Sequence, residues 1–232
     1  DAFLCMKNIN VKNVNITLAN IQNSNANFDG ITVFDSDFSF GKANNSLFTL
    51  KNLNFINGTS SRIMFEPEHS FFNFTNHCYS DSIFSTIIRT NGILNTTIIF
   101  KNCSYKSVIG TASIFVLTNS NVKFQNLSLT DLFIPNYCNF YNGKNTNTYI
   151  SSSLFRNIYS VGQSSFVFSI KDSYVNFFNS SISNIETQFL TVFLGSWEIN
   201  NCSFIECQCY IPSSQFLMTI IEASNFESGL LS

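Results

Sequence analysis

The chain has 232 residues, of which only 11% are charged, and it combines 27 phenylalanines with a formal net charge of −2. This composition argues against a nucleic-acid-binding protein, because the few scattered lysines form no basic patch. The longest apolar runs, such as Phe189–Leu194, are far shorter than the ~18 residues of a membrane-spanning helix.

A short motif recurs from one end of the chain to the other. It consists of an apolar residue, any residue, usually Asn, a variable residue, a small polar residue and then, in most copies, another apolar residue. Clear copies are Val11–Ile16, Leu50–Phe55, Phe124–Leu129 and Ile199–Phe204. The commonest step between copies is 22 residues. A recurrence with this period predicts a repeat architecture.

The position of the Asn in the motif predicts the direction of its side chain. The residue two places before it is apolar in every copy, and residues two apart in a strand share a face. We therefore expect the Asn to point into the core, where stacked coils ~4.8 Å apart let each amide bond to the next. The predicted members of this internal ladder are Asn13, Asp35, Asn52, Asn73, Asn102, Asn126, Asn157, Asn179 and Asn201.

The segments between the motifs predict strands and turns, because no helical periodicity is sustained. A coil of ~22 residues accommodates three short strands and three turns, and crossovers of one sense are expected to wind right-handed. The sequence therefore predicts an all-β fold, a right-handed parallel β-helix (solenoid) of about ten coils. We expect a single domain over residues 1–232, with loop insertions near residues 77–95 and 135–148.

The motif resembles the repeats of the right-handed parallel β-helix proteins of the pectin-lyase-like superfamily. It is also similar to the Asn/Phe repeats of polymorphic outer-membrane adhesins. The resemblance covers roughly residues 8–226. It implies the architecture, whereas the same scaffold carries lyases, hydrolases, adhesins and fibre proteins.

The carboxylates of the sequence do not predict a catalytic centre. A polysaccharide lyase or hydrolase needs acidic residues clustered on one face. Asp35 and Asp37 are close in sequence but are expected on opposite faces, and Glu66 and Glu68 lie near His69 without an opposing carboxylate. We predict no catalytic residue and no cofactor, and a carbohydrate-active enzyme on this scaffold remains the alternative.

The metal-binding residue types are also too sparse for a predicted metal site. His69 and His77 lie near Cys78, but a zinc site would need further ligands at a usable spacing. Cys202, Cys207 and Cys209 are close together and fit a disulfide or buried thiols better than a metal. Because the chain has seven cysteines, at least one is free or pairs outside this chain.

Nine Asn-x-Ser/Thr sequons and an uncharged polar surface favour a secreted glycoprotein. The sequons outside the ladder are the predicted glycan carriers: Asn15, Asn44, Asn57 and Asn95. The remaining five sequons, which include Asn73, lie within the ladder, and four of these are predicted to be bare because a glycan cannot enter a filled core: Asn102, Asn126, Asn179 and Asn201.

The combined pattern predicts an extracellular structural or adhesive glycoprotein, secreted or at the cell surface. We expect a β-helical rod or fibre module that continues into further repeats or stacks end to end with its own copies. The expected partners are therefore its own copies, further solenoid repeats and N-linked glycans, without nucleic acid and without a membrane span. No column of threonines repeats, so binding to a flat lattice such as ice is not predicted.

Overall fold

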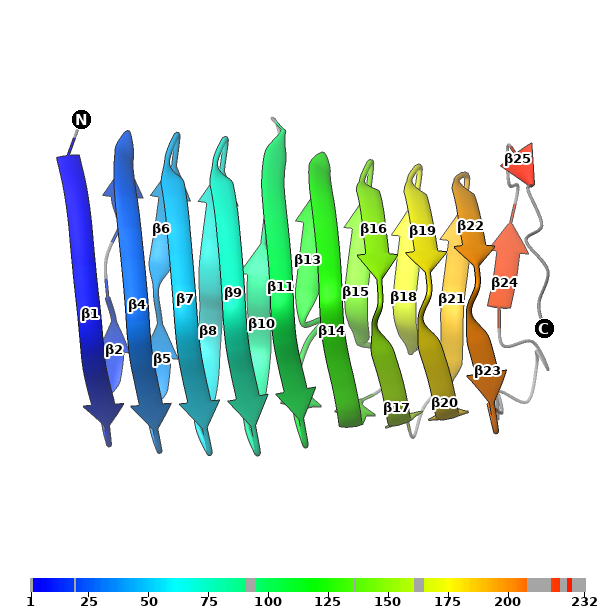
Figure 1. The fold of residues 1–232 in the computed structure, drawn as a ribbon, viewed down its shortest axis with the longest axis horizontal. Coiled ribbons are helices and arrows are strands. Elements are labelled where there is room, and N and C mark those ends of the chain that lie inside the picture. The colour runs from blue at the N-terminus through cyan, green and yellow to red at the C-terminus, as the bar shows by residue number, and fades with distance from the viewer. Residues whose placement is uncertain are drawn as a thin grey trace.

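The computed structural model describes residues 2–18, 20–90, 95–135, 137–160, 165–207, 218–221 and 225–226. These residues form one parallel β-solenoid of about eight turns, and they contain no helix that could cross a membrane. In Figure 1 the chain advances from left to right, with strands running down the front and up the back, which makes the winding right-handed. The predicted fold class is confirmed, with about eight coils rather than ten.

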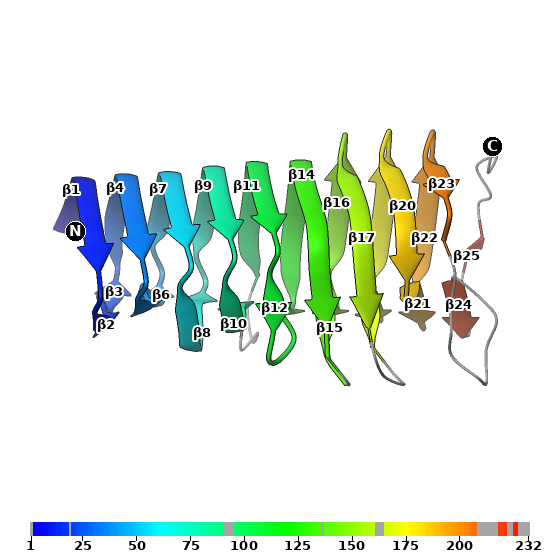
Figure 2. The same ribbon diagram turned by 90° about the horizontal axis from the view of Figure 1, so that it is seen from below.

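Strands of two layers alternate along the chain (Figures 1 and 2). The front layer of Figure 1 contains β1 (Ala2–Lys12), β4 (Ser24–Phe34), β7 (Leu47–Ile56), β9 (Phe71–Ser80), β11 (Thr96–Lys106), β14 (Ser120–Ile134), β16 (Asn147–Ser151), β17 (Leu154–Ser160), β19 (Tyr174–Phe178), β20 (Ser181–Glu186), β22 (Ser196–Asn200), β23 (Ser203–Ile205) and β25 (Asn225–Phe226). The layer behind contains β2 (Asn15–Thr17), β3 (Ile21–Gln22), β5 (Asp37–Ser39), β6 (Gly41–Asn44), β8 (Thr59–Glu68), β10 (Ile83–Arg89), β12 (Ile109–Gly110), β13 (Phe115–Thr118), β15 (Asn139–Lys144), β18 (Phe166–Lys171), β21 (Gln188–Phe193) and β24 (Met218–Ile221).

Each coil changes direction at residues with positive φ, and these residues stack into three rows. Row A contains Asn8, Gly30, Asn52, Asn76, Asn102, Asn126, Ser152, Asn179 and Asn201. Row B contains Asn13, Asp35, Asn57, Asp81, Ser107, Asp131, Asn157, Asn184 and Glu206. Row C contains Asn23, Asn45, His69, Asn119, Asn145, Asp172 and Leu194. Among the described non-glycine residues with positive φ, only Tyr137 lies outside the three rows.

The backbone conformation explains why Asn and Asp dominate these rows. A positive φ brings the Cβ of most residues too close to the backbone, and Asn, Asp and Gly tolerate this region best. Gly30, at φ 68°, occupies the row A position of its coil. The motif therefore contains Asn because the backbone has a positive φ at the corners of each coil.

Coil length varies on one side of the solenoid. Row C precedes row A by seven positions, as from Asn45 to Asn52, and row A precedes row B by five, as from Asn52 to Asn57. The stretch from row B to row C varies in length, with ten positions after Asn13 and fifteen after Asn157. All length variation is thus confined to the layer behind.

This arrangement corrects the extent of both expected loop insertions. Residues 77–90 belong mainly to β9 and β10, while residues 91–94 lie outside the described part of the chain. In the second insertion, the described residues outside strands are Pro135, Tyr137, Cys138, Asn145 and Thr146. Its strands β15 and β16 pair in register with neighbouring coils. Longer coils keep these residues in strands because each backbone N–H and C=O then has a partner.

The core consists of aromatic and aliphatic side chains stacked at the coil spacing. The rings of Phe74 and Phe100 are 4.9 Å apart and almost parallel, and those of Phe100 and Phe124 are 4.7 Å apart. Tyr79 and Tyr105 stack in the same way at 4.8 Å. Register between coils is therefore fixed by ring packing as well as by strand pairing.

Most polar side chains buried inside the solenoid are the hydroxyls of Ser and Thr. The residue after row C points inward and is Ser or Thr in most coils. Ser46 N donates to Ser70 Oγ at 3.1 Å, and Ser70 Oγ donates to Glu68 O at 2.6 Å. Thr146 N donates to Ser173 Oγ in the same manner. A short hydroxyl can thus satisfy the backbone at a tight internal corner.

Candidate functional site

The amide side chains of row A form a hydrogen-bonded ladder on the outside of the molecule. Asn126 Nδ2 donates to Asn102 Oδ1 at 2.9 Å, and Asn102 donates to Asn76 at 3.1 Å. Asn201 donates to Asn179 at 3.0 Å. All of these side chains are exposed. The prediction of an internal ladder was therefore wrong in direction, although the amides do bond between coils.

Positive φ also explains this error, because it interrupts the alternation of a strand. In the stretch 124–129, Phe124, Leu127 and Leu129 are buried, whereas Gln125 and Asn126 are both exposed. The corner therefore lies at the Asn itself and not after it.

The predicted ladder residues belong to two different rows. Row A holds Asn52, Asn102, Asn126, Asn179 and Asn201, and row B holds Asn13, Asp35 and Asn157. Asn73 lies in neither row and is half-buried in β9. The sequence signal that separates the rows is the constant five-residue step between them, as in the pair Asn52 and Asn57.

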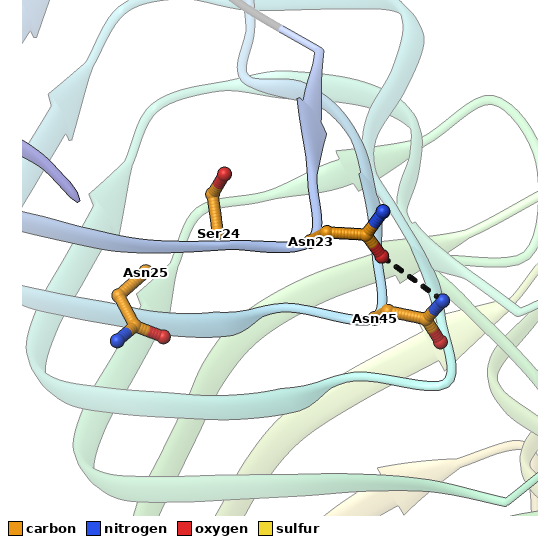
Figure 3. Close-up of a pocket in the computed structure, with 4 residues that line it drawn as sticks. All are labelled: Asn23, Ser24, Asn25 and Asn45. Atoms are coloured by element: carbon orange, nitrogen blue, oxygen red, sulfur yellow. Dashed lines mark hydrogen bonds between the residues drawn. The ribbon is translucent and has the colours of Figure 1, made fainter. Parts of the chain in front are cut away.

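A shallow polar hollow of about 530 Å³ lies at row C near the start of the chain and is shown in Figure 3. It is lined by Asn23, Ser24, Asn25 and Asn45. Asn45 Nδ2 donates to Asn23 Oδ1 at 3.2 Å, and Ser24 Oγ donates to Gln22 O. The hollow offers amide and hydroxyl groups without a charge.

A second hollow, of about 470 Å³, lies at row A in the later coils. Its lining is Ser152, Ser153, Leu154, Asn179, Ser180, Ser181, Asn201, Cys202 and Ser203. Ser152 replaces the Asn of earlier coils, and small serines follow it where the earlier coils have Leu53 or Leu127. The small side chains leave the hollow, which we call the serine hollow.

Aromatic and amide side chains alternate on the outer face that leads to the serine hollow. Tyr149 on β16 and Tyr174 on β19 have ring centroids 5.7 Å apart, and Tyr149 is 48% exposed. Asn176 Nδ2 donates to the Tyr174 hydroxyl at 3.0 Å and to Glu198 at 2.6 Å. Phe178, which directly precedes the row A residue Asn179, is 52% exposed.

We call this group the aromatic–amide patch; its members are Asn147, Tyr149, Tyr174, Asn176, Phe178 and Glu198. Partial burial raises the pKa of Tyr174, so its hydroxyl stays protonated at neutral pH. The patch presents flat apolar rings beside fixed donors and acceptors, which suits ligands with both apolar faces and hydroxyl groups. Sequence reasoning missed it, although Tyr149 and Tyr174 lie at even distances after row C and so could be placed on the outside.

The carboxylates considered as catalytic candidates in the sequence form hydrogen bonds or ion pairs with neighbouring coils. Asp35 Oδ1 accepts from Asn57 at 2.7 Å, and Asp37 accepts from the backbone and hydroxyl of Ser61. Glu66 forms an ion pair with Lys42 of the preceding coil at 3.0 Å. The described residues contain no group of three or more potential metal ligands.

The two histidines and the cysteine weighed as a first metal site, His69, His77 and Cys78, point in different directions. His77 is buried, and its Nε2 lies 2.9 Å from Leu50 O, while burial lowers its pKa to about 4. Cys103 lies beside it in the core, and burial raises its pKa to about 12. Cys78 points to the outer face of β9, and His69 is exposed at row C. His77 and Cys103 therefore act as core residues.

Six cysteines lie in the described part of the chain, and all six are free thiols there: Cys5, Cys78, Cys103, Cys138, Cys202 and Cys207. Cys209 falls outside the described residues.

The sequons expected to carry glycans lie at the surface, and their occupancy remains a prediction. Asn15, Asn57 and Asn95 are exposed, and Asn44 is half-buried. The row A sequons are exposed as well, so burial does not protect them: Asn102, Asn126, Asn179 and Asn201.

Comparisons with known proteins give distant structural neighbours. The chain matches no family model, and no curated protein matches its sequence. QnrB1, a plasmid-mediated fluoroquinolone resistance protein, is 12% identical, with 97% of this chain and 92% of its own chain covered and a TM-score of 0.22. HetL, a pentapeptide repeat protein involved in heterocyst differentiation regulation from the cyanobacterium Nostoc, is 5% identical, with 95% and 86% covered and a TM-score of 0.22.

These neighbours are pentapeptide repeat proteins. A TM-score of 0.22 is too low for either likeness to bear on the function of this chain. Membership of the pectin-lyase-like superfamily therefore stays a prediction.

Proposed function

We propose that this β-solenoid is an extracellular structural or adhesive glycoprotein, a rigid rod that contacts glycans through the aromatic–amide patch and the serine hollow. The observation that carries the proposal is the pair formed by the exposed Tyr149 and the half-buried Tyr174, with ring centroids 5.7 Å apart beside the Asn176 amide. Strands fix these side chains, so little conformational entropy is lost when a ligand binds.

The linings of the two hollows favour binding over hydrolysis. The hollow at row C is lined by Asn and Ser alone, the serine hollow adds one Leu and one Cys, and neither lining contains a carboxylate. A glycosidase needs two carboxyl groups, ~5 to ~10 Å apart, flanking the scissile bond. The carbohydrate-active enzyme therefore remains the less supported alternative.

Further repeats or end-to-end stacking with its own copies form part of the proposal. Stacked parallel coils bond along the axis through backbone groups and row amides, and a following coil of the same kind would extend both. The low charged fraction of 11% leaves little repulsion between such surfaces.

A glycan array followed by calorimetry with the strongest oligosaccharide tests the proposed function. Tyr174→Ala removes stacking surface and an acceptor, and we expect a loss of affinity of about tenfold or more. Tyr137→Ala is the matched control, because Tyr137 is 78% exposed in the connection between β14 and β15, outside the patch, and this variant should bind like the unmodified chain. Absence of binding across the array, or equal losses in both variants, would contradict the glycan-binding role.

A further inference from the structure

A second outer row, two positions after row B, changes from polar to apolar in the middle of the solenoid. It reads Asn15, Asp37, Thr59, Ile83, Ile109, Phe133, Tyr159 and Glu186. The four apolar members, which we call the apolar ridge, are neighbours in successive coils by strand register. Ile83, Ile109 and Tyr159 are 42%, 40% and 45% exposed. A contiguous apolar surface bounded by polar residues marks an interaction site.

The corner beside the apolar ridge carries charges that alternate from coil to coil. Asp81 lies in the coil of Ile83, and Asp131 in the coil of Phe133, both in row B. Lys106 and Arg156 are exposed and directly precede row B in the coils of Ile109 and Tyr159. Along the ridge the charges are therefore negative, positive, negative and positive. When a second copy runs in the opposite direction, each charge lies opposite a charge of the other sign.

We propose that the apolar ridge binds a second copy of this chain, side by side and antiparallel. The two-fold axis of this pairing lies in the interface, perpendicular to the solenoid axis, and passes between the coils of Ile109 and Phe133. It keeps corner against corner and ridge against ridge while it reverses the order of the coils. Ile109 then faces Phe133 of the second copy, and Ile83 faces its Tyr159.

The same operation matches the charges across the interface. Lys106 faces Asp131 of the second copy, and Asp81 faces its Arg156. In a parallel pairing, the two-fold axis would run along the solenoid. The charged corner of each copy would then lie on the opposite side of the ridge from the charged corner of the other copy. The charge order therefore selects the antiparallel arrangement and the second copy as the occupant.

The expected association is weak, because the ridge spans four coils or about 14 Å at ~4.8 Å per coil. An interface of that length lies toward or below the ~1,200 Å² at the low end of stable complexes. The aromatic–amide patch lies on a different face, between rows C and A, and stays free in the pair. This pairing does not rest on the proposed glycan binding.

Sedimentation equilibrium of the full chain from about 1 μM to about 500 μM tests the pairing at low salt. We expect a reversible monomer–dimer equilibrium. Ile109→Asp should weaken the dimer at least about tenfold, because it places a charge in the apolar contact. Leu47→Asp is the matched control, since Leu47 is 43% exposed on the face between rows C and A, away from the ridge, and it should leave the equilibrium unchanged.

A charge series then tests the antiparallel register. Lys106→Glu puts like charges opposite each other and should weaken the dimer about tenfold. Adding Asp131→Asn should restore part of the affinity, and Asn suits the φ of 56° at this position. A monomer at every concentration, or an assembly that ignores Ile109→Asp and Lys106→Glu, would overturn the proposal. End-to-end stacking would give species larger than a dimer that ignore both ridge variants.

Discussion

Single residues in the left-handed region set the corners of this solenoid. Asn126 has φ 55° and donates a hydrogen bond to Asn102 on the outside of the solenoid. Two separate requirements therefore favour an amide at this position. The conformation requires Asn, Asp or Gly, and the ladder requires a donor and an acceptor. Core aromatics alone would not fix where each coil turns.

Substitutions at Asn126 should separate these two demands. Asn126→Ala loses the ladder bond and strains the backbone, and we expect it to destabilise the fold by about 1–3 kcal/mol. Asn126→Gly loses only the bond and should cost less than Asn126→Ala. Chemical denaturation of both variants measures the difference, with Gln125→Ala as the neighbouring exposed control. A Gly variant less stable than the Ala variant would show that the left-handed conformation is not what selects Asn here.

His77 should make stability depend on pH between about 4 and 6.5. Its pKa in the fold is about 4, below the ordinary value of 6.5, because burial disfavours the imidazolium. Between these values the unfolded chain binds a proton that the folded chain does not, so stability falls as pH falls through this range. The full effect is roughly 3 kcal/mol.

Comparison with a variant isolates this histidine from the carboxylates that titrate nearby. The pH dependence of unfolding is measured for the unmodified chain and for His77→Gln, which keeps an amide near Leu50 O. The difference between the two curves should level off above pH 6.5. Parallel curves from pH 4 to 7 would mean that His77 is not buried in its neutral form.

Strands and corners differ in how readily the sequence predicts them. Alternating apolar residues and the recurring Asn predicted stacked strands, a parallel solenoid and its right-handed winding. They did not predict the outward direction of the Asn, because φ at one residue reverses the face of all that follow. The coil count was also too high. Corners occupied by Gly30 or Ser152 do not show the Asn that marks the others, so the row B residues Asp35 and Asn157 were assigned to the ladder in those coils.

The surface was harder to predict than the core. Most core positions are apolar in successive coils, so their period is visible in the sequence. Tyr149 and Tyr174 are recognisable as a pair only after the register of β16 and β19 makes them diagonal neighbours with their rings in contact. The same holds for the apolar ridge, whose members lie 24 to 26 residues apart in the sequence.

The internal hydroxyl row should stabilise the corner between the two layers. Ser70 Oγ accepts from Ser46 N and donates to Glu68 O, and Ser70 is buried. Ser70→Ala leaves both backbone groups without these bonds and should cost about 1–3 kcal/mol. Thermal unfolding measures the loss, with Ser104→Ala on the outer face of β11 as the control. Equal stabilities of the two variants would argue against a hydroxyl row that satisfies the backbone.

The whole molecule is a rod in which equivalent residues advance by one coil spacing at a time. The distance between two row A residues should therefore increase by ~4.8 Å for each coil between them. Asn52 and Asn179 are five coils apart, Asn52 and Asn201 six, and Asn8 and Asn201 eight. The corresponding separations are about 24 Å, 29 Å and 38 Å.

Pulsed electron–electron resonance between nitroxide labels at these pairs tests the central claim most directly. Each pair is introduced as cysteines into a chain whose natural cysteines are replaced by Ser or Ala. A parallel solenoid with its amide rows outside predicts that native protein labels at every site and that distances rise linearly with coil number. Sites that label only after unfolding, or distances that do not increase from five to eight coils, would contradict it.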